Sequence, residues 1–505
     1  MKKKRITVIF FCILLIASIL RAWGLDRSFV LDEFRTIHIA GLDLSEMASA
    51  IKTDSYGPVS YLVLHAWLGV RGGESWIRLI FVIFGLLSVV MVYVIARNIA
   101  SQRYALTAMF IASVMPMQIW VSQYVRGIGP GIFFLLTATY FFLKMKRHPS
   151  GGGPKFYDAA GYVLSSILAV YSFYFSFFVI AAQNIVYIVL SRKGIKDILI
   201  WIASQAAIAI SFLPWLGILL EQLKRGNISA NFSAISNAGL KVVGIPLGAY
   251  MRSFSGLLGL DQQFLTDIPM AGAVDKSIAI LSAFLLFVSI ITLSIAFIRR
   301  YKAYENTALA AFSVFSLTPF ILSVIFNGVF ATAIVPRYFA VSSIFTVFIY
   351  THAAAAIKKR VISSAVIILF AVIGIARLAD FSRPLIDYKS AAVFLRENIR
   401  DDECLLFTGG EWAYRYYSGL PKNSISTLDY MKMYEAGSGF KPADLVNPSL
   451  LKVKLAPFRT IWVYGSGERM SGLADYVMSQ VNRFGYRISG EYKFKNISIL
   501  KLKAF

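Results

Sequence analysis

The chain has 505 residues, of which 57% are hydrophobic and only 15% are charged, and its net charge is +24. Soluble domains carry about 25% charged residues, so this composition and a mean hydropathy of +0.65 exclude a soluble globular protein and predict a polytopic membrane protein. The basic residues lie in short segments between apolar runs, where they determine topology, and we expect no nucleic-acid partner. Cys12 and Cys404 lie in an apolar run and a distant polar region, and predict neither a disulfide nor a cysteine metal site.

Apolar runs of about 20 residues suit membrane-spanning helices. We place about eleven of them, at residues 6–22, 76–96, 104–121, 127–144, 157–172, 174–191, 197–220, 277–298, 308–327, 338–357 and 361–379. The first run follows a basic start and is similar to a signal peptide, but its length favours an uncleaved span. The pair at 157–191 has two interpretations, a helical hairpin or one broken helix.

Lysine and arginine residues fall on one side of this topology, as they do on the cytoplasmic side of membrane proteins. With a cytoplasmic N-terminus, this side receives Lys2, Lys3, Lys4, Arg5, Arg97, Arg103, Lys144, Lys146, Arg147, Lys155, Arg192, Lys193, Lys196, Arg299, Arg300, Lys302, Lys358, Lys359 and Arg360. We therefore expect a multi-pass protein of the cell membrane, the inner membrane of a bacterium. Its C-terminal region would be extracytoplasmic.

The outer side then receives the long segment 23–75, the short turn around 122–126, the loop 221–276, the turn 328–337 and everything after the last span. We expect two domains: a transmembrane domain over residues 1–379 and an extracytoplasmic α/β domain over residues 380–505. In the first outer segment, Leu44–Ile51 has the helical apolar spacing of an interfacial helix. The run 59–70 is too short to cross and predicts an interfacial or re-entrant helix.

The C-terminal region has the composition of a soluble domain. Helical periodicity occurs over residues 388–399 and 473–484, and strands are indicated at 403–408 and 460–464. Alternation over residues 487–503 predicts a hairpin. This order of strands and helices is typical of a small α/β domain. Gly465-Ser-Gly467 lacks the spacing of a dinucleotide-binding loop.

The adjacent carboxylates Asp32 and Glu33 directly follow the first span. They are either an interfacial pair that anchors the loop, or an acid–base group whose partial desolvation would raise its basicity. The residues alone favour neither interpretation.

Four other outer-side residues have a structural and a functional interpretation. Asp54 either caps the next helix or binds a divalent metal cation together with Asp32 or Glu33. Arg126 and Arg337 either snorkel to the interface or meet a phosphate. Because Arg126 lies on the side with few basic residues, we favour a phosphate partner. His38 has no metal-ligand spacing with another histidine, and a packing or solvent role is favoured.

The motifs occur in an order that resembles a known family. They are Asp32-Glu33 after the first span, Tyr56-Gly57-Pro58 before a helix, Ser122-Gln-Tyr-Val-Arg126, Leu213-Pro-Trp-Leu216 and Val335-Pro-Arg-Tyr338. Over roughly residues 1–380 the chain is similar to the C-type (GT-C) membrane glycosyltransferases. Within them it resembles the bacterial protein-mannosyltransferase and aminoarabinose-transferase-like (family 39-like) branch.

The resemblance implies transfer of a sugar from a polyprenyl-phosphate donor to a lipid, glycan or protein acceptor at the outer membrane face. Asp32 would be the catalytic base, with Glu33 beside it. Arg126, Arg337 and Tyr338 would bind the donor phosphate, and Asp54 and His38 are candidates for a metal or acceptor site.

The chain departs from many relatives, which have His-Pro-Pro in place of Tyr56-Gly57-Pro58 and an acidic residue in place of Tyr124. The rival hypotheses are a transporter or flippase of lipid-linked glycans and an inactive glycan-binding scaffold. Transporters commonly show internal repeats and ionisable residues near the bilayer midplane, whereas here the charges lie at the ends of the spans.

Overall fold

The computed structural model describes residues 2–69, 72–147, 156–190, 194–230, 304–330, 336–356, 386–426, 446–466 and 471–505, with the single positions 368 and 372. The expected span 277–298, nearly all of the expected span 361–379 and most of the expected loop 221–276 lie outside the described residues. The contacts divide the chain into two compact units. The first unit consists of the described residues within Met1–Leu25, Ile39–Asn227 and Ala234–Ser382. The second unit consists of those within Asp26–His38, Ile228–Ser233 and Arg383–Phe505.

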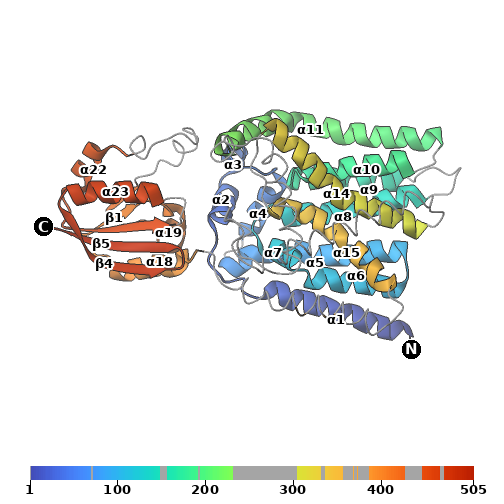
Figure 1. The fold of residues 1–505 in the computed structure, drawn as a ribbon, viewed down its shortest axis with the longest axis horizontal. Helices are drawn as coiled ribbons and strands as arrows, with labels where there is room; N and C mark the ends of the chain where they lie inside the picture. Colours follow the sequence, from blue (N-terminus) through green and yellow to red (C-terminus); the bar gives the residue numbers. More distant parts are fainter. Residues whose placement is uncertain are drawn as a thin grey trace. The chain divides into compact units, whose positions relative to one another are not determined.

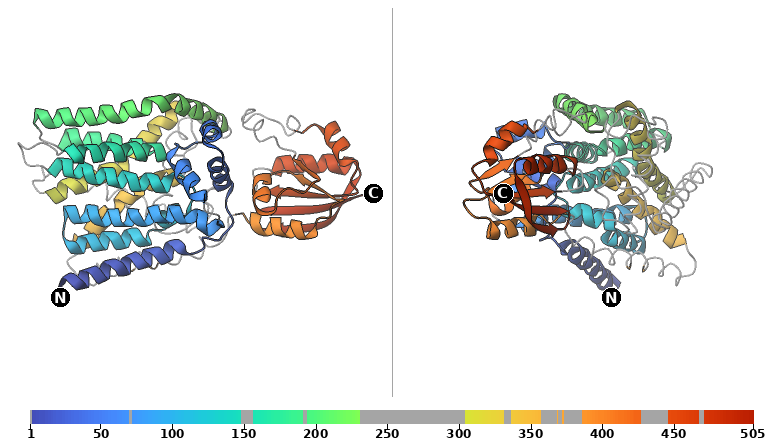
Figure 2. Two further views of the ribbon diagram at one scale, coloured as in Figure 1. Left: turned by 180° about the vertical axis from the view of Figure 1, so that it is seen from behind. Right: turned by 60° about the vertical axis from the view of Figure 1, so that its left-hand side comes forward.

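The first unit is a bundle of long helices that lie side by side, with short helices at one end (Figures 1 and 2). The long helices are α1 (Lys2–Ala22), α5 (Glu74–Ile99), α6 (Gln102–Val114), α8 (Ile128–Arg147), α9 (Phe156–Ser172), α10 (Ser176–Leu190), α11 (Ile195–Ala230), α14 (Tyr304–Phe330) and α15 (Ala340–Ala356). The short elements are α3 (Leu44–Ile51), α4 (Val59–Leu68), α7 (Pro116–Gln123) and the 3-10 helix η2 (Pro336–Phe339).

A polytopic helical membrane protein is confirmed. Among the described residues, six helices are long and apolar enough to cross a membrane, and α6 with α7 makes a seventh if the bent pair is one span. The count of eleven is not established. The pair at 157–191 consists of two separate helices, α9 and α10.

The expected span 104–121 is broken. Helices α6 and α7 meet at an angle of 60° between Val114 and Pro116. Proline has no N–H and restricts the residue before it to extended backbone, and Met115 has φ −69° and ψ 112°. The buried Arg21 guanidinium, at the end of α1, donates to the carbonyl oxygens of Ala112 at 3.2 Å and Ser113 at 2.9 Å. Arg21 therefore satisfies carbonyls at the point where the helix breaks.

The short helices match two expectations. Helix α3 covers the predicted interfacial helix, and buries Met47 and Ile51 on one face. Helix α4 has ten residues, about 15 Å at 1.5 Å per residue, which is too short to cross a bilayer core of about 30 Å. The turns that carry Asp54 and Arg126 lie at the end of the bundle where α3, α4 and α7 are found (Figure 1).

The second unit contains a five-stranded sheet of order β2-β1-β3-β5-β4. Strand β1 (Cys404–Phe407) pairs in parallel with β2 (Ser424–Ser426) and β3 (Thr460–Ser466), and β5 (Ile497–Ala504) pairs antiparallel with β3 and β4 (Tyr486–Phe494). Its helices in the C-terminal region are α18 (Tyr388–Asn398), α19 (Glu411–Ser418), α22 (Pro448–Leu455) and α23 (Ser471–Arg483). The expected small α/β domain and its five predicted elements are confirmed, whereas β2, α19 and α22 were not predicted.

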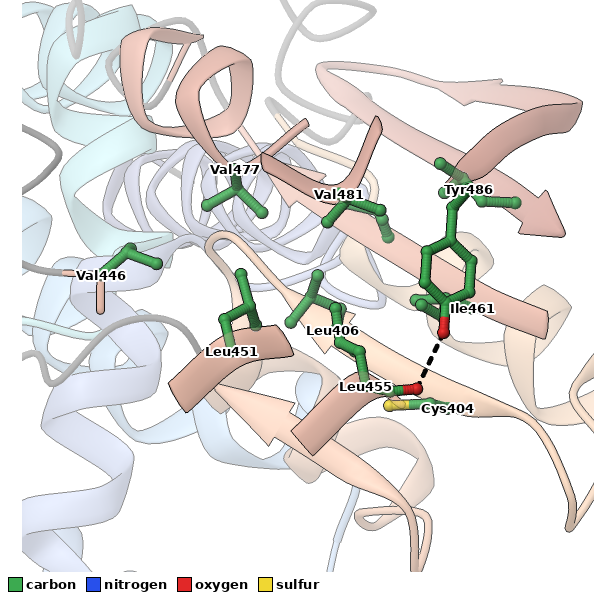
Figure 3. Packing of buried hydrophobic residues seen from close by; sticks show 11 residues of the cluster. Cys404, Leu406, Val446, Leu451, Leu455, Ile461, Val477, Val481 and Tyr486 are labelled. Atoms are coloured by element: carbon green, nitrogen blue, oxygen red, sulfur yellow. Dashed lines mark hydrogen bonds between the residues drawn. The ribbon is translucent and has the colours of Figure 1, made fainter. Parts of the chain in front are cut away.

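The core of this domain lies between the sheet and the helices α22 and α23. Leu406 and Ile461 of adjacent strands pack with Leu455 of α22 and Val481 of α23, all buried (Figure 3). Tyr486 closes the cluster, and its hydroxyl donates to the Leu455 carbonyl at 2.8 Å. Free Cys404 is one of the buried residues, and burial raises the pKa of its thiol to about 12, so it packs as an apolar side chain.

Glu403 precedes β1 and is held by three donors. Its carboxylate accepts from the Trp462 indole at 2.7 Å and from the Arg400 amide at 3.1 Å, and it lies 3.2 Å from the Lys501 ammonium. Burial alone would raise the pKa of Glu403, but the hydrogen bonds and the Lys501 charge outweigh it, so its pKa lies below the ordinary value. The charged form is therefore favoured by folding.

Glu403→Gln should destabilise the C-terminal sheet by about 1.5–3 kcal/mol at neutral pH, the usual cost of losing hydrogen bonds to a charged group. Because the native pKa is lowered, this stabilisation is present above the unfolded-state pKa of about 4.3 and is lost as pH falls through the lower native value.

Hydrogen exchange of β1 and β3 measures the local free energy of opening. The control is Glu491→Gln, which breaks the exposed pair with Lys493 and should cost less than about 1 kcal/mol. Equal effects for the two variants at neutral pH would contradict this account.

Candidate functional site

Asp54 is buried between α3 and α4, and both of its carboxylate oxygens accept hydrogen bonds. Oδ1 accepts from the Ser55 amide at 2.8 Å, and Oδ2 accepts from the Tyr61 hydroxyl at 2.5 Å. The interpretation of Asp54 as a helix cap is wrong, because Pro58 is the residue that precedes α4 and no side-chain cap is formed. Asp54 instead holds the loop against the first turn of α4.

Arg126 pairs with this carboxylate across 72 residues of sequence, with its Nη1 at 2.5 Å from Asp54 Oδ2. Both side chains are 4% exposed. A buried charge is costly unless it is paired and hydrogen-bonded, so the loop after α7 and the loop before α4 are tied together. Arg126 therefore does not snorkel to an interface.

Backbone packing fixes the same two loops against the end of α9. A Cβ added to Gly57 would overlap the carbonyl oxygen of Tyr171, and one added to Gly127 would overlap that of Ser172. Interiors are close-packed and tolerate such overlap poorly. Both glycines are therefore needed where the loops approach the helix.

An aromatic cluster connects Arg126 to Arg337. The Arg126 guanidinium carbon lies 5.0 Å from the ring centre of Tyr56, which stacks on Phe173 at 5.8 Å. Phe173 in turn contacts Tyr338 at 6.0 Å, and Phe175 contacts Tyr338 at 4.9 Å. The turn between α9 and α10 thus connects the motif of Tyr56 and Arg126 with that of Arg337 and Tyr338.

Arg337 and Tyr338 lie in η2, directly before α15. The Arg337 guanidinium carbon lies 5.9 Å from the ring centre of Tyr124 and 5.7 Å from that of Tyr338, within the range of cation–π attraction. Tyr124 stacks on Trp120 at 4.6 Å. The rings of Tyr124 and Tyr338 therefore flank the Arg337 guanidinium, and Arg337 and Tyr338 are both half-buried.

The first unit thus brings together Asp54, Arg126, Arg337 and Tyr338. The proline-tryptophan motif of α11 supports the same region, since Trp215 donates to the Tyr174 hydroxyl at 2.7 Å. The sequence does not predict the roles of Tyr61, Tyr56 and Phe173, because isolated aromatic residues in apolar helices and turns carry no local signal. The Tyr56-Gly57-Pro58 motif was the one pointer to them.

Asp32, Glu33 and His38 belong to the second unit. They lie on α2 (Leu31–Ala40), a helix that the sequence did not predict. Glu33 is buried and accepts from the Val30 amide at 3.0 Å, as the acidic residue of a capping box does. Asp32 is half-buried in the first turn of α2. Burial and the nearby Arg415 charge lower the pKa of His38.

A divalent cation does not fit at Asp54. Its carboxylate already accepts from Tyr61, Ser55 and Arg126, and the arginine supplies the positive charge that a metal would provide. Within the described ranges, no group of three or more His, Cys, Asp or Glu side chains could hold a metal ion. We derive no step through a metal.

Comparison with known proteins identifies the fold. Residues 55–218 match the family described as dolichyl-phosphate-mannose-protein mannosyltransferase. A search of curated proteins gives no significant match.

Several solved structures are similar. The oligosaccharyltransferase of Archaeoglobus fulgidus in complex with Zn and sulfate has a TM-score of 0.51 at 14% identity, covering 89% of this chain and 67% of that one. The oligosaccharyltransferase AglB of the same organism, with an inhibitory peptide and a dolichol-phosphate, has a TM-score of 0.50 at 14% identity, covering 90% and 69%. ArnT from Cupriavidus metallidurans in the apo state has a TM-score of 0.47 at 13% identity, covering 99% and 98%. The expected resemblance to the C-type fold is confirmed.

The ion pair of Asp54 and Arg126 should behave as a coupled buried pair. Arg126→Ala or Asp54→Ala alone leaves an uncompensated buried charge and should cost about 3–5 kcal/mol. The double variant should cost less than the sum of the two. Thermal unfolding of the purified protein in detergent, with the loss of helical signal as the readout, measures the three values. Arg97→Ala, which removes an exposed guanidinium that donates to the Ala100 carbonyl at 3.3 Å, is the control and should cost less than about 1 kcal/mol. Additive single effects would show that the two charges are not coupled.

Proposed function

We propose that this chain is a C-type membrane glycosyltransferase of the protein-mannosyltransferase and aminoarabinose-transferase type, and that it uses a polyprenyl-phosphate-linked sugar as its donor. It transfers the sugar to a lipid, glycan or protein acceptor at the outer face of the cell membrane. The observation that carries the proposal is the group formed by the buried Asp54–Arg126 pair and the half-buried Arg337. This group lies in a fold whose matching family description names a dolichyl-phosphate sugar.

On this proposal, Asp32 is the base. Its carboxylate takes the proton of an acceptor hydroxyl or amine as the acceptor atom attacks the anomeric carbon of the sugar. The bond between that carbon and the phosphate oxygen breaks, the configuration inverts, and the polyprenyl phosphate leaves with the electron pair. Asp32 suits this role because it is half-buried, whereas the adjacent Glu33 is used to cap α2.

Arg337 is the cation that we assign to the leaving phosphate. Negative charge develops on the phosphate oxygen as the sugar leaves, and a fixed cation in a site of low dielectric stabilises that charge. The rings of Tyr124 and Tyr338 lie within cation–π range of the guanidinium and orient it. Arg126 has a different role, because its charge is paired with Asp54, and it maintains the shape of the site.

We propose that the donor lies in the outer leaflet, and the distribution of basic residues in the first unit supports this proposal. The N-terminus of α1, the end of α5 and the end of α8 lie at one end of the first unit, and η2 and the loop of Asp54 lie toward the other (Figure 1). The first of these ends carries Arg97 and Lys144. The positive-inside rule assigns such an end to the cytoplasm, so the Asp54–Arg126 end would face outward.

Asp32→Asn should abolish transfer, because an amide cannot take a proton in this pH range. General-base catalysis contributes about 10²–10⁴-fold. The variant and the wild type are compared in a deletion strain by mass analysis of envelope lipids and glycans, with expression matched. Asp43→Asn, which removes an exposed carboxylate that makes no cap hydrogen bond before α3, should retain full transfer. Normal transfer in the Asp32→Asn strain would remove this residue from the mechanism.

Arg337→Ala should weaken binding of polyprenyl phosphate about 10- to 100-fold, the loss of one hydrogen-bonded charge contact. Native mass spectrometry of the purified protein, titrated with the lipid phosphate, gives the affinity. Arg97→Ala is the control, because Arg97 is an exposed arginine at the far end of α5, and it should bind as the wild type does. An unchanged affinity for Arg337→Ala would refute the assignment of this arginine to the phosphate.

A further inference from the structure

Residues 26–38 form one compact unit with the C-terminal α/β domain, although more than 340 positions of sequence separate them from its first helix. The Tyr417 hydroxyl donates to Ser28 Oγ at 3.4 Å and accepts from the Phe29 amide at 3.1 Å. Phe29 and Phe34, which flank α2's first turn, are both buried. This segment is therefore bound by side chains of the domain.

Five rings make the contact, and we call them the aromatic clamp: Phe29, Phe34, Tyr388, Tyr416 and Tyr417. Phe34 lies at its centre, with ring-centre distances of 5.8 Å to Tyr388, 5.4 Å to Tyr416 and 5.7 Å to Tyr417. All three contacts are edge-to-face, the geometry that aromatic pairs prefer. Phe29 adds a similar contact to Tyr416 at 5.7 Å.

The residues that flank the segment, Leu25 and Ala40, belong to the first unit and are bonded within it. The buried Arg78 of α5 donates to the Leu25 carbonyl at 2.7 Å, and His65 Nδ1 of α4 lies 2.8 Å from the Ala40 carbonyl. Between these two anchors the chain leaves the first unit and returns to it. Among the intervening residues, Phe29 and Phe34 contact aromatic rings of the domain.

We infer that the C-terminal domain is a positioning module for Asp32, and that the aromatic clamp sets the place and orientation of this carboxylate. The inference rests on the proposed function, in which Asp32 is the base. Asp32 lies between Phe29 and Phe34 in sequence, and Glu33 caps the same helix. A shift of α2 would move Asp32 with it. A displacement of about 1 Å can cost 10²-fold in rate, so loosening the clamp should lower turnover without removing any reacting group.

Tyr417→Phe and Phe34→Leu test the inference in the full-length protein. The first removes the hydroxyl that bonds Ser28 and Phe29 but keeps a ring, and the second removes the central ring but keeps an apolar side chain. Tyr492→Phe is the matched control, because Tyr492 packs on Phe394 and Trp462 in the same domain, away from the clamp. Hydrogen exchange of residues 26–38 and the kinetics of transfer are measured for each variant.

We expect both clamp variants to increase hydrogen exchange in residues 26–38 and to lower kcat by about 10- to 100-fold, with the KM for the lipid donor changed less than threefold. Tyr492→Phe should change neither. Unchanged exchange in both clamp variants would overturn the contact. Increased exchange with wild-type kcat would overturn the positioning role. A wild-type protein that lacks transfer activity would contradict the proposed function instead, and the exchange result would still decide whether the clamp holds the segment.

Discussion

The buried ion pair of Asp54 and Arg126 is the interaction on which the arrangement of the candidate site in the first unit depends. It joins the loop before α4 to the loop after α7, and its charges are compensated inside the protein rather than by water. The same two loops meet the end of α9 at Gly57 and Gly127, where no side chain would fit. The ion pair and the backbone contacts therefore fix the positions of the two loops and of the end of α9. The rings of Tyr56, Phe173 and Tyr338 pack against one another there, next to Arg337.

Arg126 and Arg337 had the same two interpretations from the sequence, but their contacts in the structure differ. Arg126 forms an ion pair with Asp54 and so holds two loops together, whereas Arg337 is flanked by the rings of Tyr124 and Tyr338. A similar division separates the adjacent carboxylates, because Glu33 caps α2. In each pair, the first member makes a structural contact, and the other, Arg337 or Asp32, is the residue that we assign to the reaction.

Sequence reasoning predicted the membrane class, α3, α4 and most of the C-terminal strands, because hydrophobic periodicity and length are local signals. It missed the break at Pro116, since the apolar run continues through it and the compensating donor, Arg21, lies about 90 residues away. It missed α2, whose first turn was read as a loop beside the membrane. It also could not foresee the Asp54–Arg126 pair or the clamp around Phe34, because both join residues that are distant in sequence and are specified only by packing.

The central claim is that a sugar is transferred from a lipid phosphate, and the purified full-length protein in lipid nanodiscs tests it most directly. The protein is incubated with lipids extracted from the cell envelope of a deletion strain, and mass spectrometry follows the lipid pool with time. The account predicts that one polyprenyl-phosphate sugar loses its sugar and appears as free polyprenyl phosphate, while an acceptor species gains the same mass. A lipid-linked sugar that crosses the bilayer of a reconstituted vesicle intact, with no free polyprenyl phosphate formed, would contradict it.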